Sequence, residues 1–402
     1  MKKGQALEVA REYGTPTYLY DVSIIQKQIS SFKKAFEDYP LHIRYAMKSN
    51  SNINILKLML RNGLGLDTVS IPEIKIGMLA GFVPEQIVFT PNMIGFQEII
   101  DAVEMGVQIN IENLSNLKKF GERYGSEKSC CIRLNPDIVT ESEKDKVEKW
   151  HSQSKFGISL SQIDELLEIV EKYSMSIDGI HIHSSHVIMS PEVFLKGAKI
   201  IFELAENFPN LEYVDFGGGI KVAHQSNEKV IDIMDLGKAL KPLYKALCLK
   251  MKREIQLWFE PGRFLLGESG YLLVQAKVLK TNGTIDFVGV DSGFSHLIRP
   301  MFYNAFHEIE NLSNPEGEQK KYNIVGNLCE IDNFAVDRIL NEVSEGDFLA
   351  IQNAGAYGFC MSSQYNSRFR PAEVLIVDSK PHLIRKREVL EDFIRNQVDI
   401  EL

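Results

Sequence analysis

Residues 44 to 50 read Arg44-Tyr45-Ala46-Met47-Lys48-Ser49-Asn50, the pattern of a short buried strand that ends in a lysine. An ammonium group is rarely buried unless it is paired or used chemically. One chemical use is a Schiff base with an aldehyde cofactor, because desolvation lowers the pKa of the amine and makes it nucleophilic. Taken alone, Lys48 is also compatible with an ordinary lysine at a strand end.

Short apolar runs of this kind recur between about residue 40 and residue 262. The eight candidate strands are His42–Met47, Gly65–Val69, Ile87–Thr90, Val107–Glu112, Cys131–Asn135, Gly179–Ser184, Tyr213–Phe216 and Gln256–Glu260. Between most of them apolar residues recur every three or four positions, as in Pro72–Ala80 and Ser161–Tyr173, which predicts helices. This alternation favours an α/β fold with a (β/α)8 TIM-like barrel. A doubly wound sheet is the alternative, because the pattern alone does not establish closure.

The pattern changes after Gly262, where strands follow one another without regular helical partners. The candidate strands are Tyr271–Leu279, Thr284–Val290, Tyr322–Val325, Asp347–Gln352 and Ala372–Val377. Several are bounded by glycine-containing turns, which is typical of a mostly β domain. The strand-like opening Thr15-Pro16-Thr17-Tyr18-Leu19-Tyr20 precedes the barrel and can join that domain. We therefore predict a barrel over residues 23–265 and a C-terminal β domain over 266–402 that includes the N-terminal strand of residues 1–22.

The composition excludes several classes of protein. A length of 402 residues suits two domains, and 44% hydrophobic with 25% charged residues is typical of globular proteins. The net charge of −9 argues against a nucleic-acid surface. We find no apolar run long enough to cross a bilayer, and the start has no apolar core of a signal peptide. The five cysteines have neither metal-ligand spacing nor the density of a disulfide scaffold, so we expect no metal and a reducing cytoplasm.

Catalytic groups of such barrels sit at the C-terminal ends of the strands. In this sequence those ends carry Lys48, Asp67, Asn135, His183, Gly217-Gly218-Gly219 and Glu260-Pro261-Gly262-Arg263. Each also has a purely structural interpretation. His183 can be a buried core histidine, the glycines a flexible turn, and Glu260 a carboxylate paired with Arg263.

Pyridoxal 5′-phosphate can use every member of this set. Its aldehyde requires an amine such as Lys48, and its flat ring stacks well on an imidazole such as His183. A protonated pyridine nitrogen requires an anion, for which Glu260 is the candidate, and that ion pair makes the ring an electron sink. Consecutive backbone N–H groups at Gly217–Gly219 suit a phosphate, together with those near Gly262 and Arg263.

The chain resembles the fold-type III pyridoxal-phosphate-dependent decarboxylases, with their alanine racemase-like barrel, and within them the diaminopimelate decarboxylases. The similarity runs from Thr15-Pro16 to Pro371-Ala372-Glu373-Val374. The motifs that carry it are Tyr45–Asn50, Ser154-Lys155-Phe156-Gly157-Ile158, Asp215-Phe216-Gly217-Gly218-Gly219, Glu260-Pro261-Gly262-Arg263, Arg299-Pro300-Met301-Phe302-Tyr303, Gly326-Asn327-Leu328-Cys329-Glu330 and Gly355-Ala356-Tyr357-Gly358-Phe359. The resemblance implies a PLP-binding barrel, a sandwich-like or Greek-key-like β domain that contributes to the substrate site, and a homodimer with shared active sites at the interface.

The resemblance also implies a role for each site residue. Lys48, Cys329 and His183 form the catalytic set: Lys48 binds the cofactor aldehyde, Cys329 moves the proton at Cα, and His183 stacks on the ring. The cofactor-binding set is Lys48, Asp67, His183, His186, Gly217, Gly218, Gly219, Glu260, Gly262, Arg263 and Tyr357. The substrate-binding set is Arg263, Arg299, Tyr303, Glu330 and Tyr357, in which the arginines hold a distal carboxylate. Cys329 and Glu330 reach the site from the other subunit.

The expected reaction is decarboxylation of meso-2,6-diaminopimelate to L-lysine and CO₂. Glu330 would bind the distal ammonium group, where ornithine-specific relatives usually have aspartate. Two departures from the family pattern motivate an alternative substrate, such as D-ornithine, D-lysine or a specialised diamino acid. They are His183-Ser184-Ser185-His186 in place of His-x-Gly-Ser, and Glu148-Lys149-Trp150-His151 in place of a Ser-Thr-Gly segment. A non-catalytic binding protein is a further alternative.

Overall fold

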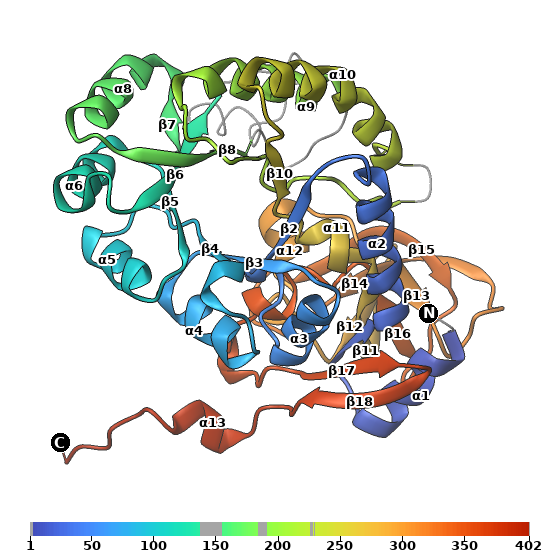
Figure 1. Ribbon diagram of the computed structural model, residues 1–402. Helices are drawn as coiled ribbons and strands as arrows, with labels where there is room; N and C mark the ends of the chain where they lie inside the picture. The colour runs from blue at the N-terminus through green and yellow to red at the C-terminus, as the bar shows by residue number, and fades with distance from the viewer. Residues whose placement is uncertain (1–2, 137–154, 184–190, 226–227, 229, 402) are drawn as a thin grey trace. The chain divides into compact units, whose positions relative to one another are not determined.

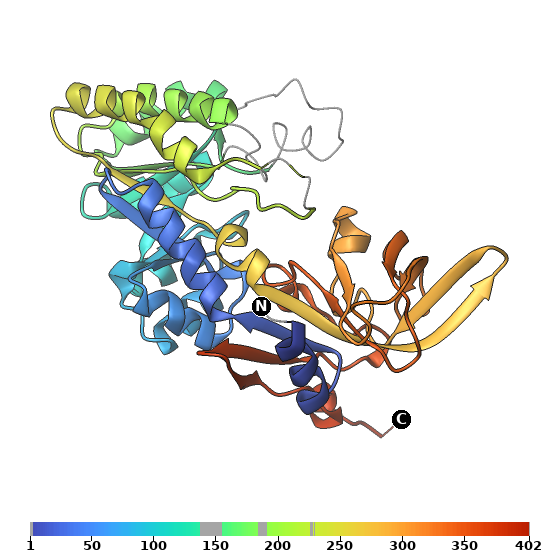
Figure 2. The ribbon, with the colours of Figure 1, turned by 90° about the vertical axis from the view of Figure 1, so that its right-hand side faces the viewer.

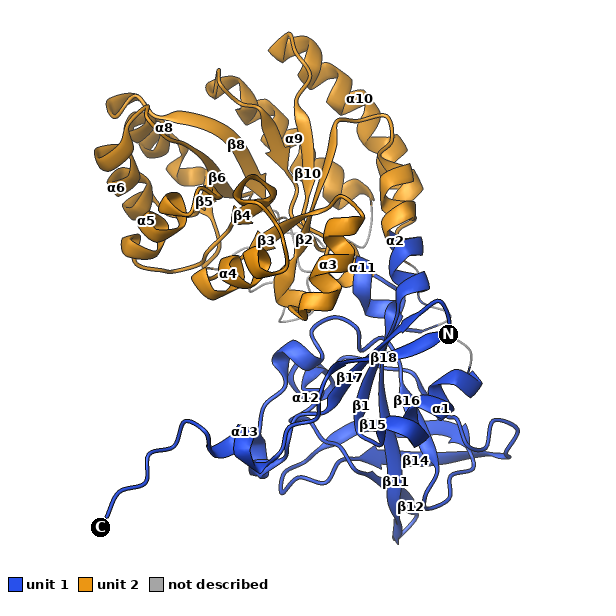
Figure 3. Ribbon diagram, turned by 60° about the horizontal axis from the view of Figure 1, so that its bottom comes forward, with its two compact units in different colours: residues 1–28, 222–229, 265–402 blue, residues 29–221, 230–264 orange. Residues whose placement is uncertain are grey.

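The computed structural model describes residues 3–136, 155–183, 191–225, 228 and 230–401. The chain divides into two compact units, one of residues 29–221 and 230–264, the other of residues 1–28, 222–229 and 265–402 (Figure 3). Within the described ranges, no helix has the length and apolar character needed to span a membrane.

The first unit is a closed barrel of parallel strands (Figure 1). Its strands are β2 (Leu41–Ala46), β3 (Gly65–Thr68), β4 (Ile87–Phe89), β5 (Gln108–Ile111), β6 (Ser129–Asn135), β8 (Ser176–Ile182), β9 (Tyr213–Asp215) and β10 (Gln256–Phe259). The ring closes because β10 pairs with both β2 and β9, while β5 pairs with β6. All eight predicted strands and the predicted barrel are confirmed, and closure removes the doubly wound alternative. A short strand, β7 (Ile158–Ser159), pairs with the end of β6.

Helices precede, separate and follow the strands of the barrel. They are α2 (Val22–Ala35), α3 (Ile53–Arg61), α4 (Ile71–Leu79), α5 (Phe96–Glu104), α6 (Leu114–Tyr124), α8 (Ile163–Lys172), α9 (Pro191–Leu204), α10 (Ile233–Met251) and α11 (Arg263–Leu266). The start of α4 follows from its sequence, since the Ser70 side chain accepts the Glu73 N–H and Pro72 occupies the first turn. The two helices predicted from periodicity correspond to α4 and α8.

Aromatic and apolar side chains fill part of the barrel. Val88, Cys131, Tyr213 and Trp258 form one buried cluster. The rings of Tyr213 and Trp258 are stacked with centroids 3.8 Å apart, and the guanidinium of Arg44 lies 4.2 Å from the Trp258 ring. Cys131 is therefore a core residue, and its burial raises the pKa of its thiol well above the ordinary value.

The second unit is built on one nine-stranded sheet. Its strands are β1 (Thr17–Asp21), β11 (Gly270–Asn282), β12 (Ile285–Val290), β13 (Ile309–Asn311), β14 (Gln319–Val325), β15 (Asn333–Asn341), β16 (Phe348–Ile351), β17 (Ala372–Val377) and β18 (Lys380–Arg385). Its helices are α1 (Lys3–Tyr13), α12 (Arg299–Tyr303) and α13 (Leu390–Ile394). β11 and β12 form a long hairpin, seen from the side in Figure 2. The five strands predicted after Gly262 are all present, whereas β13, β15 and β18 were not predicted.

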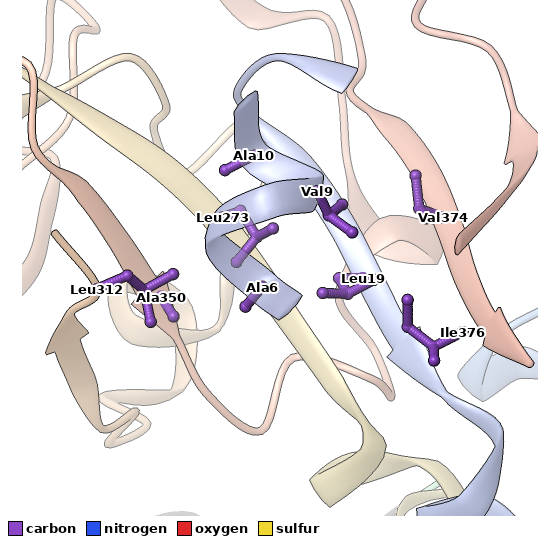
Figure 4. Packing of buried hydrophobic residues seen from close by; sticks show 9 residues of the cluster. All are labelled: Ala6, Val9, Ala10, Leu19, Leu273, Leu312, Ala350, Val374 and Ile376. Carbon is purple, nitrogen blue, oxygen red and sulfur yellow. The ribbon is translucent and has the colours of Figure 1, made fainter. Parts of the chain in front are cut away.

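The N-terminal strand β1 belongs to this second sheet. β1 pairs with β11 on one side and with β17 on the other, so both ends of the chain contribute to one sheet. Helix α1 packs on the sheet through Ala6, Val9 and Ala10, which meet Leu19 and Val374 in a buried cluster (Figure 4). This core forms only after residues more than 350 positions apart have come together.

Candidate active site

Lys48 lies in a short turn, Met47–Ser49, directly after β2 at the C-terminal rim of the barrel. Its Nζ is 2.5 Å from Oδ2 of Asp67, which is fully buried near the end of β3. The Lys48 side chain is 41% exposed, although the four strand residues before Met47 are buried. The turn carries the ammonium group past the strand end, to the rim instead of the interior. There it is held by a buried carboxylate at a defined position.

Asp67 is held in an environment that resists ionisation. Burial raises its pKa, the charge of Glu260 raises it further, and the ammonium group of Lys48 works in the opposite direction. Its second oxygen, Oδ1, is buried and has no hydrogen-bond partner among the described residues. A buried polar atom without a partner is uncommon and marks a place where a further donor fits.

Glu260 follows β10 directly and is 4% exposed. Its Oε2 lies 3.4 Å from Nε2 of His181, and the Thr90 hydroxyl lies 3.5 Å from its Oε1. Burial alone would raise its pKa, but His181, Lys48 and His183 together outweigh burial and hold the pKa far below the ordinary value. Glu260 is therefore a carboxylate at neutral pH, although it is almost completely enclosed.

His183 follows the last residue of β8 and carries an uncharged ring. The Gly218 N–H donates to its Nδ1 at 3.1 Å, which places the proton of the neutral imidazole on Nε2. Burial, followed by the positive charge of Arg133, lowers the pKa of His183 well below the ordinary value. A neutral imidazole ring is suited to stacking against a flat aromatic group.

The glycine triplet after β9 lies against this histidine. Gly217 has φ of +63°, and a Cβ there would lie 2.6 Å from Nδ1 of His183, so only glycine fits. Its N–H donates to Asp215 at 2.8 Å, and the Gly218 N–H is used by His183. Among the described residues, no hydrogen bond uses the Gly219 N–H, whereas the N–H groups of Gly217 and Gly218 are both used.

Gly262 brings two of these segments together. A Cβ at Gly262 would lie 2.9 Å from the side chain of Ser49, the residue after Lys48. The absence of a side chain therefore lets the loop after Glu260 pack against the turn that carries Lys48. Arg263 begins α11 directly after this contact.

Two barrel residues at the site were missed by the sequence reasoning. Arg133 on β6 is 9% exposed, and its guanidinium lies 4.9 Å from the Phe156 ring. His181 on β8 is 1% exposed and contacts Glu260. Arg133 lies two positions before Asn135, and His181 lies two positions before His183. Asn135 and His183 are strand-end residues that the sequence analysis had identified. Since side chains alternate along a strand, this spacing places both pairs on one face, and that signal could have found them.

Five of the predicted site residues lie in the other unit: Arg299, Tyr303, Cys329, Glu330 and Tyr357. Arg299 is 5% exposed in α12, with its guanidinium 5.7 Å from the ring of Tyr303. Tyr357 has φ of +56°, in the left-handed region. Cys329 and Glu330 are exposed neighbours in the loop between β14 and β15. His186 and the segment Glu148–His151 lie outside the described residues.

The barrel site combines a lysine at the rim, a buried carboxylate, a neutral imidazole and glycines that leave no room for side chains. This donor set fits the aldehyde, the ring nitrogen, the ring face and the phosphate of pyridoxal 5′-phosphate. The fold and the site thus define a pyridoxal-dependent enzyme of the barrel type.

Comparison with known proteins gives the family. Residues 22–267 match the family model "Pyridoxal-dependent decarboxylase, pyridoxal binding domain". The diaminopimelate decarboxylase of Methanothermobacter thermautotrophicus is 35% identical over 98% of this chain and 94% of its own length. That of Aquifex aeolicus is 34% identical over 98% and 94%. The chain therefore belongs to the pyridoxal-dependent decarboxylases, and within them to the family of the diaminopimelate decarboxylases.

Solved structures agree with this assignment. Diaminopimelate decarboxylase from Helicobacter pylori, complexed with L-lysine, superposes with a TM-score of 0.88 at 31% identity and covers 97% of this chain and 98% of that one. The M. jannaschii protein in complex with L-lysine gives a TM-score of 0.89 at 29% identity and covers 98% and 94%. A lysine/ornithine decarboxylase from Vibrio vulnificus, at 19% identity and a TM-score of 0.80, shares the fold.

Proposed function

We propose that this protein decarboxylates meso-2,6-diaminopimelate to L-lysine and CO₂ with pyridoxal 5′-phosphate as its cofactor. The observation that carries the proposal is the identity of 35% to a curated diaminopimelate decarboxylase over nearly the whole of both chains. The barrel rim supports it independently, because its residues match the chemical needs of the cofactor.

Each barrel residue has a defined task in this proposal. When bound, the cofactor supplies the electron sink for the pair of electrons left behind by CO₂. Lys48 holds the cofactor carbonyl and is itself held by Asp67. The Glu260 carboxylate keeps a proton on the ring nitrogen, and the neutral face of His183 supports the ring. The N–H groups of Gly219 and of the loop after Glu260 bind the phosphate.

We assign the binding of the substrate to Arg263, Arg299, Tyr303, Glu330 and Tyr357, by the chemistry of their side chains. Arg299 and Arg263 suit a distal carboxylate, since guanidinium groups can bind carboxylates with two parallel hydrogen bonds. Glu330 suits the distal ammonium group, Cys329 returns the proton to Cα, and Tyr303 and Tyr357 complete the site. Diaminopimelate has both distal groups, which explains why the chain carries both kinds of partner.

The direct test is a spectrum followed by an assay. The purified protein with added cofactor is expected to show the visible absorbance of a lysine imine, and to release L-lysine and CO₂ from meso-diaminopimelate. D-Ornithine and D-lysine are assayed in parallel. If the protein turns over D-ornithine or D-lysine but not diaminopimelate, the proposed substrate is wrong and the alternative substrate is correct. If the protein shows the imine absorbance but turns over none of the three amino acids, it is a non-catalytic binding protein.

Glu330→Ala is expected to lower kcat/KM for diaminopimelate by about 100-fold, the scale of removing one partner of a desolvated charge pair. Cofactor affinity should stay within about twofold of the wild type, because Glu330 belongs to the substrate side. Steady-state kinetics and a spectral titration of the apoprotein measure the two quantities. If kcat/KM and cofactor affinity fall by the same factor, Glu330 has a structural role.

We further propose that the protein is a homodimer in which Cys329 and Glu330 serve the partner's barrel. Large apolar side chains are exposed next to the proposed substrate-binding residues, with Phe302 at 63% and Ile331 at 83% exposed. Such side chains favour coverage by another protein surface. All five cysteines lie in described ranges and none forms a disulfide, which supports the proposed cytoplasmic location, because a reducing compartment disfavours disulfides.

A mixing experiment tests the shared site. Lys48→Ala and Glu330→Ala variants, each inactive alone, are unfolded together, refolded and assayed. If each site uses residues of both subunits, half of the dimers carry one intact site, and about a quarter of the wild-type activity returns. Absence of recovery from a dimeric mixture would place all site residues within one subunit.

A further inference from the structure

Cys329 and Glu330 are held by a second turn of the same unit, Tyr365–Ser367. The Tyr365 hydroxyl donates to Oε1 of Glu330 at 2.9 Å. The Cys329 N–H donates to Oδ1 of Asn366 at 2.9 Å, and the Asn366 Nδ2 donates to the Cys329 sulfur at 3.1 Å. The Tyr365 hydroxyl also lies 3.8 Å from the Cys329 sulfur. Two adjacent residues of one turn thus contact two adjacent residues of another, through side chains and the Cys329 backbone N–H.

The orientation of Asn366 is unambiguous. Its amide oxygen can only accept, and it faces the backbone N–H of Cys329. Its amide nitrogen can only donate, and it faces the sulfur. Turning the amide round would oppose an N–H to the backbone N–H of Cys329, so this contact fixes the orientation of the amide, and the contact to sulfur is compatible with it.

The turn that supplies these contacts has an unfavourable backbone conformation. Asn366 has φ of +54° and Ser367 has φ of +55°, both in the left-handed region that costs a non-glycine residue about 1–2 kcal/mol. Neighbouring contacts support it, because the Tyr365 ring stacks on Phe294 with centroids 5.4 Å apart. The Phe294 N–H in turn donates to Asp332, two residues after Glu330. Strain retained in this way often marks a functional position.

We propose that Tyr365 and Asn366 are positioning residues that hold the Glu330 carboxylate and the Cys329 thiol as one preformed unit for the substrate. The proposal rests on the proposed function, which gives Glu330 the distal ammonium and Cys329 the proton at Cα. Tyr365 occupies one oxygen of Glu330 and orients the carboxylate. Asn366 orients the Cys329 sulfur, which moves the proton at Cα. Replacing Asn366 should therefore change kcat.

The chemistry of Tyr365 suits this role. Its hydrogen bond to Glu330 raises the pKa of Tyr365 to about 12, so the hydroxyl remains protonated and can only donate to the carboxylate at the pH of the cell. A carboxylate that accepts a neutral donor keeps its charge and can still pair with an ammonium group. Tyr365 therefore orients Glu330 without neutralising it.

Two conservative variants separate the two contacts. Tyr365→Phe keeps the ring on Phe294 and removes the hydroxyl, which donates to Glu330 at 2.9 Å and lies 3.8 Å from the Cys329 sulfur. Because the shorter contact is the one to Glu330, we expect KM for diaminopimelate to rise about 10- to 100-fold with a smaller change in kcat. Asn366→Asp keeps the acceptor for the Cys329 N–H and replaces the donor to sulfur with an oxygen. Here we expect kcat to fall about 10-fold or more with KM nearly unchanged. Tyr271→Phe on β11, in the same unit, is the matched control and should match the wild type.

A double-mutant cycle distinguishes positioning from general structural support. If Tyr365 acts through Glu330, the Tyr365→Phe/Glu330→Gln double variant should be no worse than Glu330→Gln alone. Cofactor affinity and the unfolding midpoint of Tyr365→Phe should equal those of the wild type. Losses that multiply in the double variant, or a lowered unfolding midpoint, would overturn the positioning role.

The cycle is run with whichever assayed diamino acid the wild type turns over fastest. Failure of the wild type on diaminopimelate alone would then overturn the proposed substrate, while the coupling between Tyr365 and Glu330 would still be measured. Wild-type activity combined with additive losses would overturn only the positioning role. A wild type that turns over no diamino acid would overturn both.

Discussion

Replacing Lys48 with alanine is expected to lower turnover by at least about 10³-fold, since it removes the only group proposed to bind the cofactor covalently. The visible absorbance of the lysine imine should disappear with it. The fold should survive, because the Lys48 side chain is 41% exposed and its ion pair lies at the rim of the barrel. The loss therefore reports on chemistry, not on folding.

The measurement combines spectroscopy with peptide mapping. Borohydride reduction of the wild-type holoenzyme should attach the cofactor to the peptide that contains Lys48, and the variant should remain unlabelled. Lys57→Ala, on the exposed face of α3, is the matched control and should behave as the wild type. An imine absorbance that persists in Lys48→Ala would mean that another lysine holds the cofactor.

Replacing Glu260 with glutamine is expected to lower kcat by about 10²- to 10³-fold, the scale on which breaking a buried charge pair acts. The side chain keeps its shape but loses the charge that holds a proton on the ring nitrogen. Glu260 is suited to that role because the nearby His181, Lys48 and His183 keep its pKa far below the ordinary value in spite of burial. The carboxylate therefore stays charged throughout the neutral and mildly acidic range.

Two further variants give this experiment its controls. Glu254→Gln, at an exposed position just before β10, should leave turnover unchanged. Glu260→Asp keeps the charge with a shorter reach and should recover part of the activity that Glu260→Gln loses. Full kcat in Glu260→Gln would show that the ring nitrogen does not depend on this carboxylate.

Much of the barrel and its rim could be predicted from the sequence. Parallel strands in a barrel all end at one rim, so reading the residues at or next to the end of each predicted strand was enough to collect Lys48, Asp67, His183 and Glu260. The strands were readable because they are short, apolar and separated by periodic helices. In the β unit, β15 and β18 escaped prediction because many of their residues are exposed and their apolar patterns are weak.

Other parts of the site depend on distances that the sequence does not contain. Arg133 and His181 lie two positions before the strand ends, so a search restricted to the strand ends did not include them. Tyr365 and Asn366 lie in a turn far along the chain from Cys329. No sequence pattern in either segment predicts that the two segments are in contact.

The sequence alone determined which residues are available for the chemistry, because strand periodicity and ordered motifs are local properties of the chain. The tertiary structure decided in which state those residues exist. Glu260 is charged because His181 lies 3.4 Å away, and His183 is neutral because it is enclosed beside Arg133. Glu330 has a fixed orientation because Tyr365 reaches it. Charge, protonation and orientation follow from distance and burial, which only folding creates.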